Sequence, residues 1–446
     1  MASKRTLNAT NLEALGASTL AELLIEVSSG NAVIQRRLRL ALAAAEGAER
    51  ASQEVRKRIT AIARATTFVD SRKRKALLAD LEAQHQAITG PIAEADPHQA
   101  FQLLVRFLEL ADGVLERSSD TTGSVIGVFE QALGDLAELA TAAALKPEVL
   151  AEQVAELIAG NGYGQFDDLI PSVASALGEQ GLTALQHHFE DRGGPDASYG
   201  LLQIAEARGD VDAYVAQFDS KQLSQPAVAA DVALHLLEAG RAQQALEVLD
   251  GAAANVTDWL ATEWSDARIA VLDALARHED AQQQRWDLFC RSLSIPHLRA
   301  YLKQLEDFDD VEAEERAFKI ADQHPQPLLA LDFLIHWPAL AHAARYVLNH
   351  ASHWDGDAFD VLSPAADRLS SSYPLAATIL LRSMVLFTLS NSRSRRYRYA
   401  AEHLLTCERL AAEIDDWQGL ESQSSFVGRI RERFGRSRSF WQLLER

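Results

Sequence analysis

The spacing of apolar residues is the feature that most constrains the fold of this 446-residue chain. Ile34, Leu38 and Leu42 recur every four residues and would share one face of a helix. Similar segments follow along almost the whole sequence, which has only 23 Gly and 12 Pro to interrupt them. No sustained alternation of β-branched residues and no hairpin signal occurs. The sequence therefore predicts an all-α protein with about 70% or more of its residues in helices.

Capping residues and helix breakers predict where individual helices begin and end. Ser18 is an N-cap candidate for a helix that stops at Gly30, and a second helix runs from about Asn31. A further helix starts after Asp70, and Pro147 stands at a first helical position. One helix is expected over residues 97–117, and final helices over 373–389, 393–413 and 422–445.

A loose repeat of helix, short polar turn and helix begins near residue 167. Its turns centre near Gly181, Gly209, Gly240, Glu279 and Asp309, at spacings of 28, 31, 39 and 30 residues, which bracket the 34-residue tetratricopeptide period. The predicted fold is a degenerate helical-hairpin, tetratricopeptide-like α-solenoid. We expect four segments: an N-terminal basic helical unit (1–90, closed by Gly90-Pro91), a helical connecting region (91–166), the α-solenoid (167–345) and a C-terminal helical cap (346–446).

Five segments of the chain carry a family resemblance. They are LNATNLEALGASTLAELLIE, FVDSRKRKALLADLE, TTGSVIGVFEQALGDLAELA, SRRYRYAAEHLLTCERLAAEI and RERFGRSRSFWQLLE. The chain resembles an uncharacterised bacterial family of all-helical proteins, a domain of unknown function. The resemblance implies a helical fold over most of the chain and supplies no catalytic residue.

The net charge of −20 is unevenly distributed. Residues 1–80 carry +6, residues 81–390 carry −29 and residues 391–446 carry +3. Such an acidic body repels phosphate backbones at long range, although screening beyond about 10 Å lets a basic end act locally. Bulk charge therefore disfavours nucleic acid as the partner, and local charge leaves it open.

The basic N-terminal segment contains candidate contacts for an anion or an acidic partner. They are Arg36, Arg37, Arg39, Arg56, Lys57, Arg58, Arg72, Lys73, Arg74 and Lys75. The last four fall in the first turn of their helix, where cations oppose the helix dipole. A polyanion, an acidic partner or the protein's own acidic body would compensate them, and a solvated helix face is the plainer interpretation.

A second basic group lies near the C-terminus: Arg393, Arg395, Arg396 and Arg398, next to Tyr397 and Tyr399. Arginine with aromatic residues can clamp phosphates and stack bases. Tyr397, however, shares a helical face with Leu404 and Cys407, which predicts that it is buried in the core. Phe434 and Trp441 are expected to bury as the end of the solenoid.

Motifs for catalysis, metals and cofactors give nothing positive. His336, His342, His350 and His353 with Asp355 have conceivable ligand spacing, but the HExxH pattern is absent and polar surface is the plainer interpretation. Cys290 and Cys407 lack CxxC spacing and are expected to be buried and non-catalytic. The sequence thus predicts no enzyme, no cofactor, no metal and, without a run of about 18 apolar residues, no membrane partner. A cytoplasmic location is expected.

The function expected from these features is non-enzymatic. Stacked hairpins create an extended concave surface, so we expect a scaffold that binds a protein or peptide there. The alternative is a nucleic-acid or polyanion binder that uses the basic N- and C-terminal helices.

Overall fold

A computed structural model describes residues 7–257, 261–306 and 308–444. Helix accounts for 76% of the chain, and no β-strand occurs within these ranges, which confirms the all-α prediction. Among the residues that the structure describes, one isolated bridge joins Val69 to Ser118. The chain divides into two compact units, Met1–Asp219 and Ser220–Arg446.

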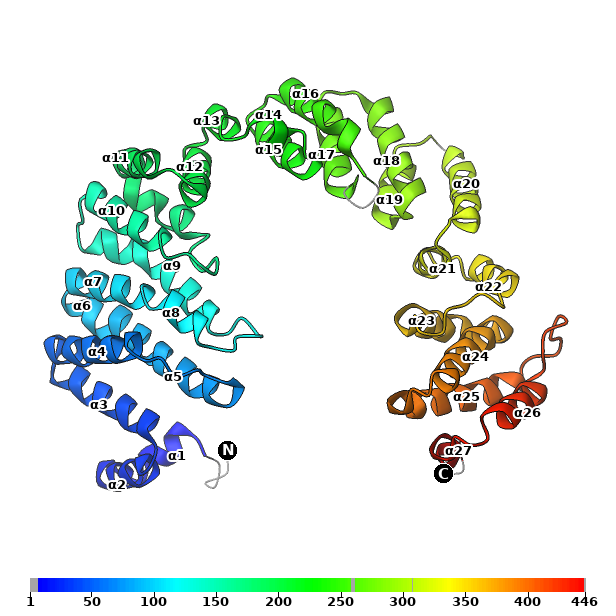
Figure 1. The fold of residues 1–446 in the computed structure, drawn as a ribbon, viewed down its shortest axis with the longest axis horizontal. Helices are drawn as coiled ribbons and strands as arrows, with labels where there is room; N and C mark the ends of the chain where they lie inside the picture. Colours follow the sequence, from blue (N-terminus) through cyan, green and yellow to red (C-terminus); the bar gives the residue numbers. More distant parts are fainter. Residues whose placement is uncertain (1–6, 258–260, 307, 445–446) are drawn as a thin grey trace. The chain divides into compact units, whose positions relative to one another are not determined.

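The first unit is a series of helices in which neighbours along the chain pack side by side (Figure 1). Its elements are α1 (Ala9–Glu13), α2 (Ala17–Ser28), α3 (Ala32–Glu46), α4 (Ala48–Ala63), α5 (Ser71–Ala87), the π-helical turn η1 (Ile88–Ile92), α6 (Ala93–Ala95), α7 (Pro97–Leu108), α8 (Ala111–Glu116), α9 (Ile126–Ala142), α10 (Pro147–Ile158), α11 (Leu169–Arg192), α12 (Pro195–Arg208) and α13 (Val211–Val215).

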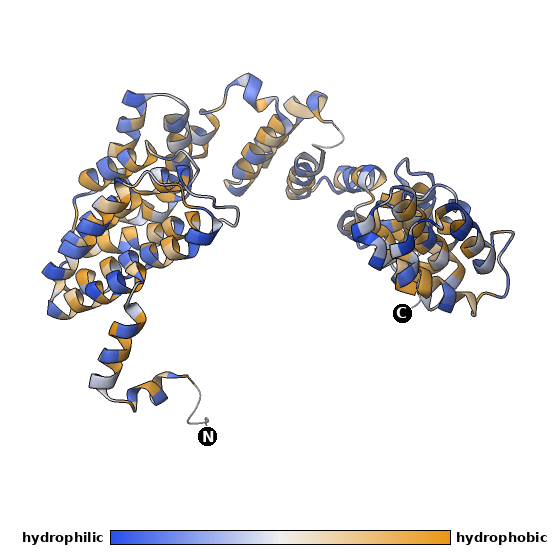
Figure 2. Ribbon diagram, turned by 60° about the horizontal axis from the view of Figure 1, so that its bottom comes forward, coloured by the Kyte–Doolittle hydropathy of each residue, from blue (hydrophilic) through white to orange (hydrophobic). Residues whose placement is uncertain are grey.

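The core of this unit runs without interruption from Leu40 to Ile204. Phe107 and Phe129 lie at its centre, both fully buried, with ring centroids 5.3 Å apart. Figure 2 shows the apolar residues of the unit gathered mainly where neighbouring helices face each other. The apolar periodicity of the sequence therefore corresponds to real packing faces, and the core continues through both residue 90 and residue 166.

Helix α2 is an exception to this relation between apolar spacing and burial. Its N-cap is Gly16 rather than the predicted Ser18, and its only buried residue is Ser28. Ile25 and Val27 are 72% and 63% exposed. The helix has an apolar pattern that no described part of the chain covers.

Other helix ends follow their signals closely. Asn31 and Asp70 cap α3 and α5 through their side chains, as predicted, and Pro147 is the first residue of α10. The single helix expected over 97–117 is instead two, α7 and α8, because the chain turns at Glu109 and Leu110.

The second unit is again a succession of packed helices (Figure 1). Its elements are α14 (Ser220–Leu223), α15 (Pro226–Glu238), α16 (Ala242–Ala252), the 3₁₀ turn η2 (Ala253–Asn255), α17 (Ala261–Ala274), α18 (His278–Ser292), α19 (Ile295–Leu302), α20 (Asp309–Gln323), α21 (Pro327–His336), α22 (Leu340–Asn349), α23 (Phe359–Ser370), α24 (Pro374–Ser390), the 3₁₀ turn η3 (Ser394–Arg396), α25 (Tyr397–Ala411), α26 (Gln423–Phe434) and α27 (Arg438–Leu444).

Helix α24 is the central element of this unit. It packs against α22, α23, α25 and α26, and its residues contribute to two core clusters, one that reaches back to Phe289 and one that reaches forward to Trp441. Tyr397 is buried in the second cluster, as predicted, against Phe440. The helix expected over 422–445 is two helices, α26 and α27, separated near Gly435.

The repeat turns are confirmed in part. Gly209 and Gly240 lie between helices with φ of 66° and 75°, a conformation that glycine adopts without a Cβ penalty. The turn predicted at Gly181 is wrong, because Gly181 is buried inside α11, and the kink of that helix is at Gly178, where φ is 55°. Helical hairpins with irregular spacing make the chain a degenerate α-solenoid.

Candidate functional site

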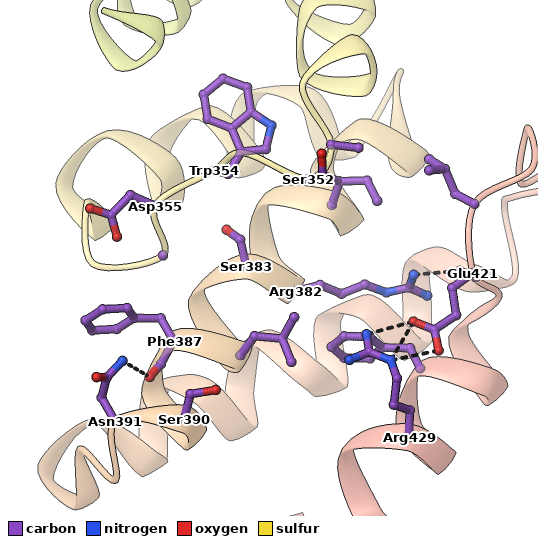
Figure 3. A pocket seen from close by; sticks show the side chains of 16 residues that line it. Ser352, Trp354, Asp355, Arg382, Ser383, Phe387, Ser390, Asn391, Glu421 and Arg429 are labelled. Atoms are coloured by element: carbon purple, nitrogen blue, oxygen red, sulfur yellow. Dashed lines mark hydrogen bonds and ion pairs between the residues drawn. The ribbon is translucent and has the colours of Figure 1, made fainter. Parts of the chain in front are cut away.

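A cavity of about 500 Å³ lies beside α24 in the second unit (Figure 3). Its walls come from α24, from α26 with the segment before it, and from residues 351–356. Apolar side chains in the lining include Trp354, Ile379, Leu386, Phe387, Leu420 and Phe426. Its polar groups are the hydroxyls of Ser352, Ser383 and Ser390, the amide of Asn391 and the charged groups of Asp355, Arg382, Glu421 and Arg429.

The segment after α22 approaches α24 unusually closely. The indole Nε1 of Trp354 donates a hydrogen bond of 3.2 Å to the carbonyl oxygen of Val347, which holds this buried ring. Gly356 follows, and a Cβ at this position would collide with the carbonyl oxygen of Ser383 and with Phe387. Only glycine allows the two backbones to meet here, so Gly356 sets the shape of this wall.

Arg382 is a buried cation in the opposite wall, and it is only 4% exposed. Its guanidinium donates to the carbonyl oxygen of Glu421 at 2.6 Å and to Oε1 of Gln423 at 2.8 and 3.1 Å. The rings of Trp417 and Phe426 each lie 4.7 Å from its Cζ. Burial lowers the pKa of Arg382 from its usual value, and no described carboxylate lies within ion-pair distance of it.

Glu421 and Arg429 form an ion pair at the edge of the same cavity. Arg429 reaches both carboxylate oxygens, at 2.8, 3.1 and 3.2 Å (Figure 3). The hydrogen bonds that Arg429 donates to Glu421 raise the pKa of this guanidinium, so the cation stays charged. The cavity therefore combines apolar side chains with fixed charges of both signs.

A second groove lies between α20 and α22, and its lining also includes Tyr373, which lies beyond the segment expected to form the solenoid. It measures about 790 Å³ and is lined by Phe318, Trp337, Leu340 and Tyr373 together with the charged Glu315, Lys319 and Arg345. Trp337 donates to Glu314 at 2.6 Å, and His342 stacks on Phe318 with ring centroids 4.9 Å apart. This groove, too, is apolar with a charged rim.

The basic N-terminal residues are divided between partners and solvent. Arg36 and Arg58 both contact Asp80, Lys57 pairs with Glu54 at 2.7 Å, and Arg74 donates to the carbonyl oxygen of Ser119 at 3.0 Å. Arg56 is half-buried. The exposed members of the series are Arg37, Arg39, Lys57, Arg72, Lys73 and Lys75. The structure therefore brings only the residues of α3 and α4 together, around Asp80.

The C-terminal basic group is partly used within the chain. Arg396 pairs with Asp357 at 2.5 Å and lies over the ring of Phe359, and Arg398 pairs with Glu402 at 3.1 Å, one turn along α25. Arg393 and Arg395 are exposed. Because Tyr397 is buried, Tyr399, which is 61% exposed, is the accessible one of the two tyrosines in this group.

Three of the histidines considered as metal ligands interact with nearby carboxylates or backbone. His342 pairs with Asp322 at 2.9 Å, His336 with Asp332 at 3.2 Å, and Nδ1 of His350 lies 2.9 Å from the carbonyl oxygen of Tyr346. Throughout the described ranges, no group of three His, Cys, Asp or Glu residues is arranged to hold a metal ion.

Both cysteines are free. Cys407 is buried as predicted, and burial raises its pKa to about 12. Cys290 is half-buried, and burial raises its pKa as well.

The residues that shape the cavity beside α24 were missed by reasoning from the sequence. One signal was present: Arg382 interrupts the apolar run TILLRSMVLF, and a charge inside such a helix is expected to be buried and hydrogen-bonded. The role of Gly356, by contrast, is visible only in the structure, because it depends on how close its backbone lies to that of Ser383.

Comparison with known proteins identifies the family. The model of a family described as a family of unknown function, DUF6880, matches residues 2–195 and 187–443. The chain belongs to this family. The resemblance inferred from five sequence segments is thereby confirmed for DUF6880, and it brings no assigned activity with it.

Two further comparisons were with curated proteins and with solved structures. A search of curated proteins found no match. Among solved structures, the chain is similar to one described as a circular tandem repeat protein with novel repeat topology and enhanced subunit contact surfaces, at 15% identity, a TM-score of 0.15 and coverage of 94% of this chain and 96% of that one. None of the described helices of the DUF6880 chain is long and apolar enough to cross a membrane.

Proposed function

We propose that this DUF6880 protein is a non-enzymatic interaction scaffold that binds a peptide segment of a protein partner in the cavity beside α24. The observation that carries the proposal is the composition of that cavity. It has a volume of about 500 Å³ and apolar side chains on its floor, and it lies beside Arg382, a buried cation without a carboxylate partner among the described residues. A large apolar side chain would fill the floor, and an adjoining carboxylate would be oriented by the positive end of the wall.

The fold supports this proposal because stacked helical hairpins offer grooves along their length. The groove between α20 and α22 is lined mainly by residues 311–345 of the segment expected to bind a partner, with Tyr373 from outside that segment, and it also combines apolar and charged side chains. We also propose a cytoplasmic location, which the two free thiols support.

The experiment compares the proteins captured from native lysate by wild type and by a variant with a filled cavity. Ser390 lines the cavity, and S390W would occupy part of its volume. Leu405 is 40% exposed on α25 outside the lining, so L405W is the matched control for an added surface indole.

We expect quantitative mass spectrometry to find at least one protein captured by wild type and by L405W and lost with S390W. A synthetic peptide from that protein should then bind the purified wild type at least tenfold more tightly than S390W, which corresponds to about 1.4 kcal/mol. Identical capture by all three proteins would reject the cavity as the binding site.

A further inference from the structure

A cationic pocket lies in the first unit, between α3 and α4 with α5 at its base. Its volume is about 220 Å³. Its lining includes four cations, Arg36, Arg39, Lys57 and Arg58, together with Glu54 and Gln84. The sequence places these cations in two separate helices, and the α3–α4 packing brings them to one opening.

Asp80 neutralises only part of this charge. This carboxylate is 4% exposed and lies beneath the pocket, where Oδ2 accepts from Arg58 at 2.5 and 2.8 Å and pairs with Arg36 at 3.3 Å. One carboxylate thus serves two guanidinium groups. Glu54 pairs with Lys57 at 2.7 Å; the Lys57 side chain is 69% exposed and that of Glu54 is 39% exposed. Four cations against two carboxylates leave a surplus of two positive charges.

Two further observations point to a missing anion. The Nε of Arg36 is buried and has no hydrogen-bond partner among the described residues, although a buried unpaired donor costs free energy. Arg58 also repels a further cation outside the lining: the pKa of Arg117 is lowered first by burial and then by repulsion from Arg58. An anion in the pocket would supply acceptors and charge together.

We propose that the pocket between α3 and α4 binds the phosphate groups of a small oligophosphate anion. Guanidinium groups match phosphate oxygens in pairs, and an ammonium group adds a point charge, which is the combination that Arg36, Arg39 and Lys57 present. The site is independent of the peptide cavity proposed above, which lies in the other unit.

A small anion fits better than a nucleic acid. The pocket is a single opening of about 220 Å³, whereas Arg72, Lys73 and Lys75 are exposed at the other end of α5 and are not part of its lining. Binding along a nucleic acid backbone requires a row of contacts, and residues 81–390 carry a charge of −29. A free oligophosphate needs only the one pocket.

The test is a calorimetric titration of the full chain with inorganic pyrophosphate at about 50 mM salt. We expect wild type to bind with a Kd below about 1 mM. The variant R39Q/K57Q removes two exposed cations without touching Asp80, and we expect it to bind at least tenfold more weakly. The control R37Q changes an exposed cation of the same helix outside the lining and should bind like wild type.

Both variants should retain the far-ultraviolet spectrum and melting temperature of wild type in the absence of pyrophosphate. No binding by wild type, or equal weakening by R37Q and R39Q/K57Q, would overturn the proposal. A single-stranded oligonucleotide that binds in place of pyrophosphate, and that is lost when Arg72, Lys73 and Lys75 are neutralised, would also overturn it and would identify a nucleic-acid surface instead.

Discussion

At the scale of single residues, Gly356 controls how closely the segment after α22 approaches α24. We predict that G356A lowers the free energy of unfolding by about 1–3 kcal/mol, because the added methyl group collides with the backbone of Ser383. The matched control is G428A, whose methyl group meets open space inside α26 and should raise stability by about 0.5–1 kcal/mol. Denaturant titration measures both, and equal effects would contradict the close approach.

Cys407 gives a second prediction at this scale, through pH. Burial raises its pKa from 9.0 to about 12, so the folded state keeps the thiol neutral while the unfolded state ionises. The stabilisation is complete below pH 9 and is lost as pH rises from 9 towards 12. Between pH 8 and pH 10, wild type should therefore lose about 1.4 kcal/mol of unfolding free energy more than C407A.

Denaturant titrations of wild type and C407A at the two pH values test this difference. Rapid labelling of Cys407 by a thiol reagent in the native state would be inconsistent with it.

Burial of single residues could be predicted where it follows helical spacing. Tyr397 and Cys407 were placed correctly because both lie on one apolar face of one helix. Arg382 and Gly356 were not, because their surroundings come from segments up to 41 residues away. Such contacts depend on tertiary packing, which local spacing does not encode.

At the scale of elements, α5 begins with a capping residue and a run of cations. Asp70 accepts hydrogen bonds from the backbone N–H groups of Arg72 and Lys73, both at 3.0 Å. We predict that D70A lowers the free energy of unfolding by about 1 kcal/mol, since it leaves two backbone donors without this acceptor. S71A, an exposed substitution in the same turn, should change nothing measurable, and thermal denaturation in which both variants behave alike would refute the cap.

The cations of the same turn differ from one another. Arg74 reaches the carbonyl oxygen of Ser119, whereas Arg72, Lys73 and Lys75 extend into solvent. Neutralising these three should leave stability unchanged or slightly higher because they oppose the helix dipole. R74A should lower stability, and the reverse order in a melting experiment would contradict these contacts.

Helix existence was the part of the fold that the sequence specified best. Side-chain caps at Asn31 and Asp70 and a proline at the start of α10 mark true ends. The break at Glu109 was missed because apolar residues continue across it, whereas the glycine and the polar residues 436–439 did signal the break at Gly435. In α2 the pattern is present without burial, which shows that periodicity reports what a helix is able to cover and not whether something covers it.

At the scale of the whole molecule, each unit has its own core. The cluster from Leu40 to Ile204 lies wholly within Met1–Asp219, and the clusters from Phe289 to Trp441 lie wholly within Ser220–Arg446. We predict that residues 1–219 and 220–446, expressed separately, each unfold cooperatively with a helical far-ultraviolet spectrum. A fragment that is unfolded on its own would show that its core depends on the other unit.

The structure divides the chain into two units, and the division into four segments stays a prediction from the sequence. Sequence punctuation at Gly90-Pro91 suggested a boundary, but Pro91 lies inside a π-helical turn whose isoleucines, Ile88 and Ile92, are fully buried. Proline and glycine mark local turns, whereas the limits of a unit depend on which helices share a core.

The proposed function depends on the cavity beside α24 as the place where a partner binds. Photo-crosslinking tests this most directly, with a benzophenone side chain introduced at Ser390, in the cavity, or at Leu405, on α25 outside its lining. We predict a discrete adduct with one protein from position 390 in intact cells and none from position 405. The absence of an adduct at 390, or the same adducts from both positions, would contradict the account.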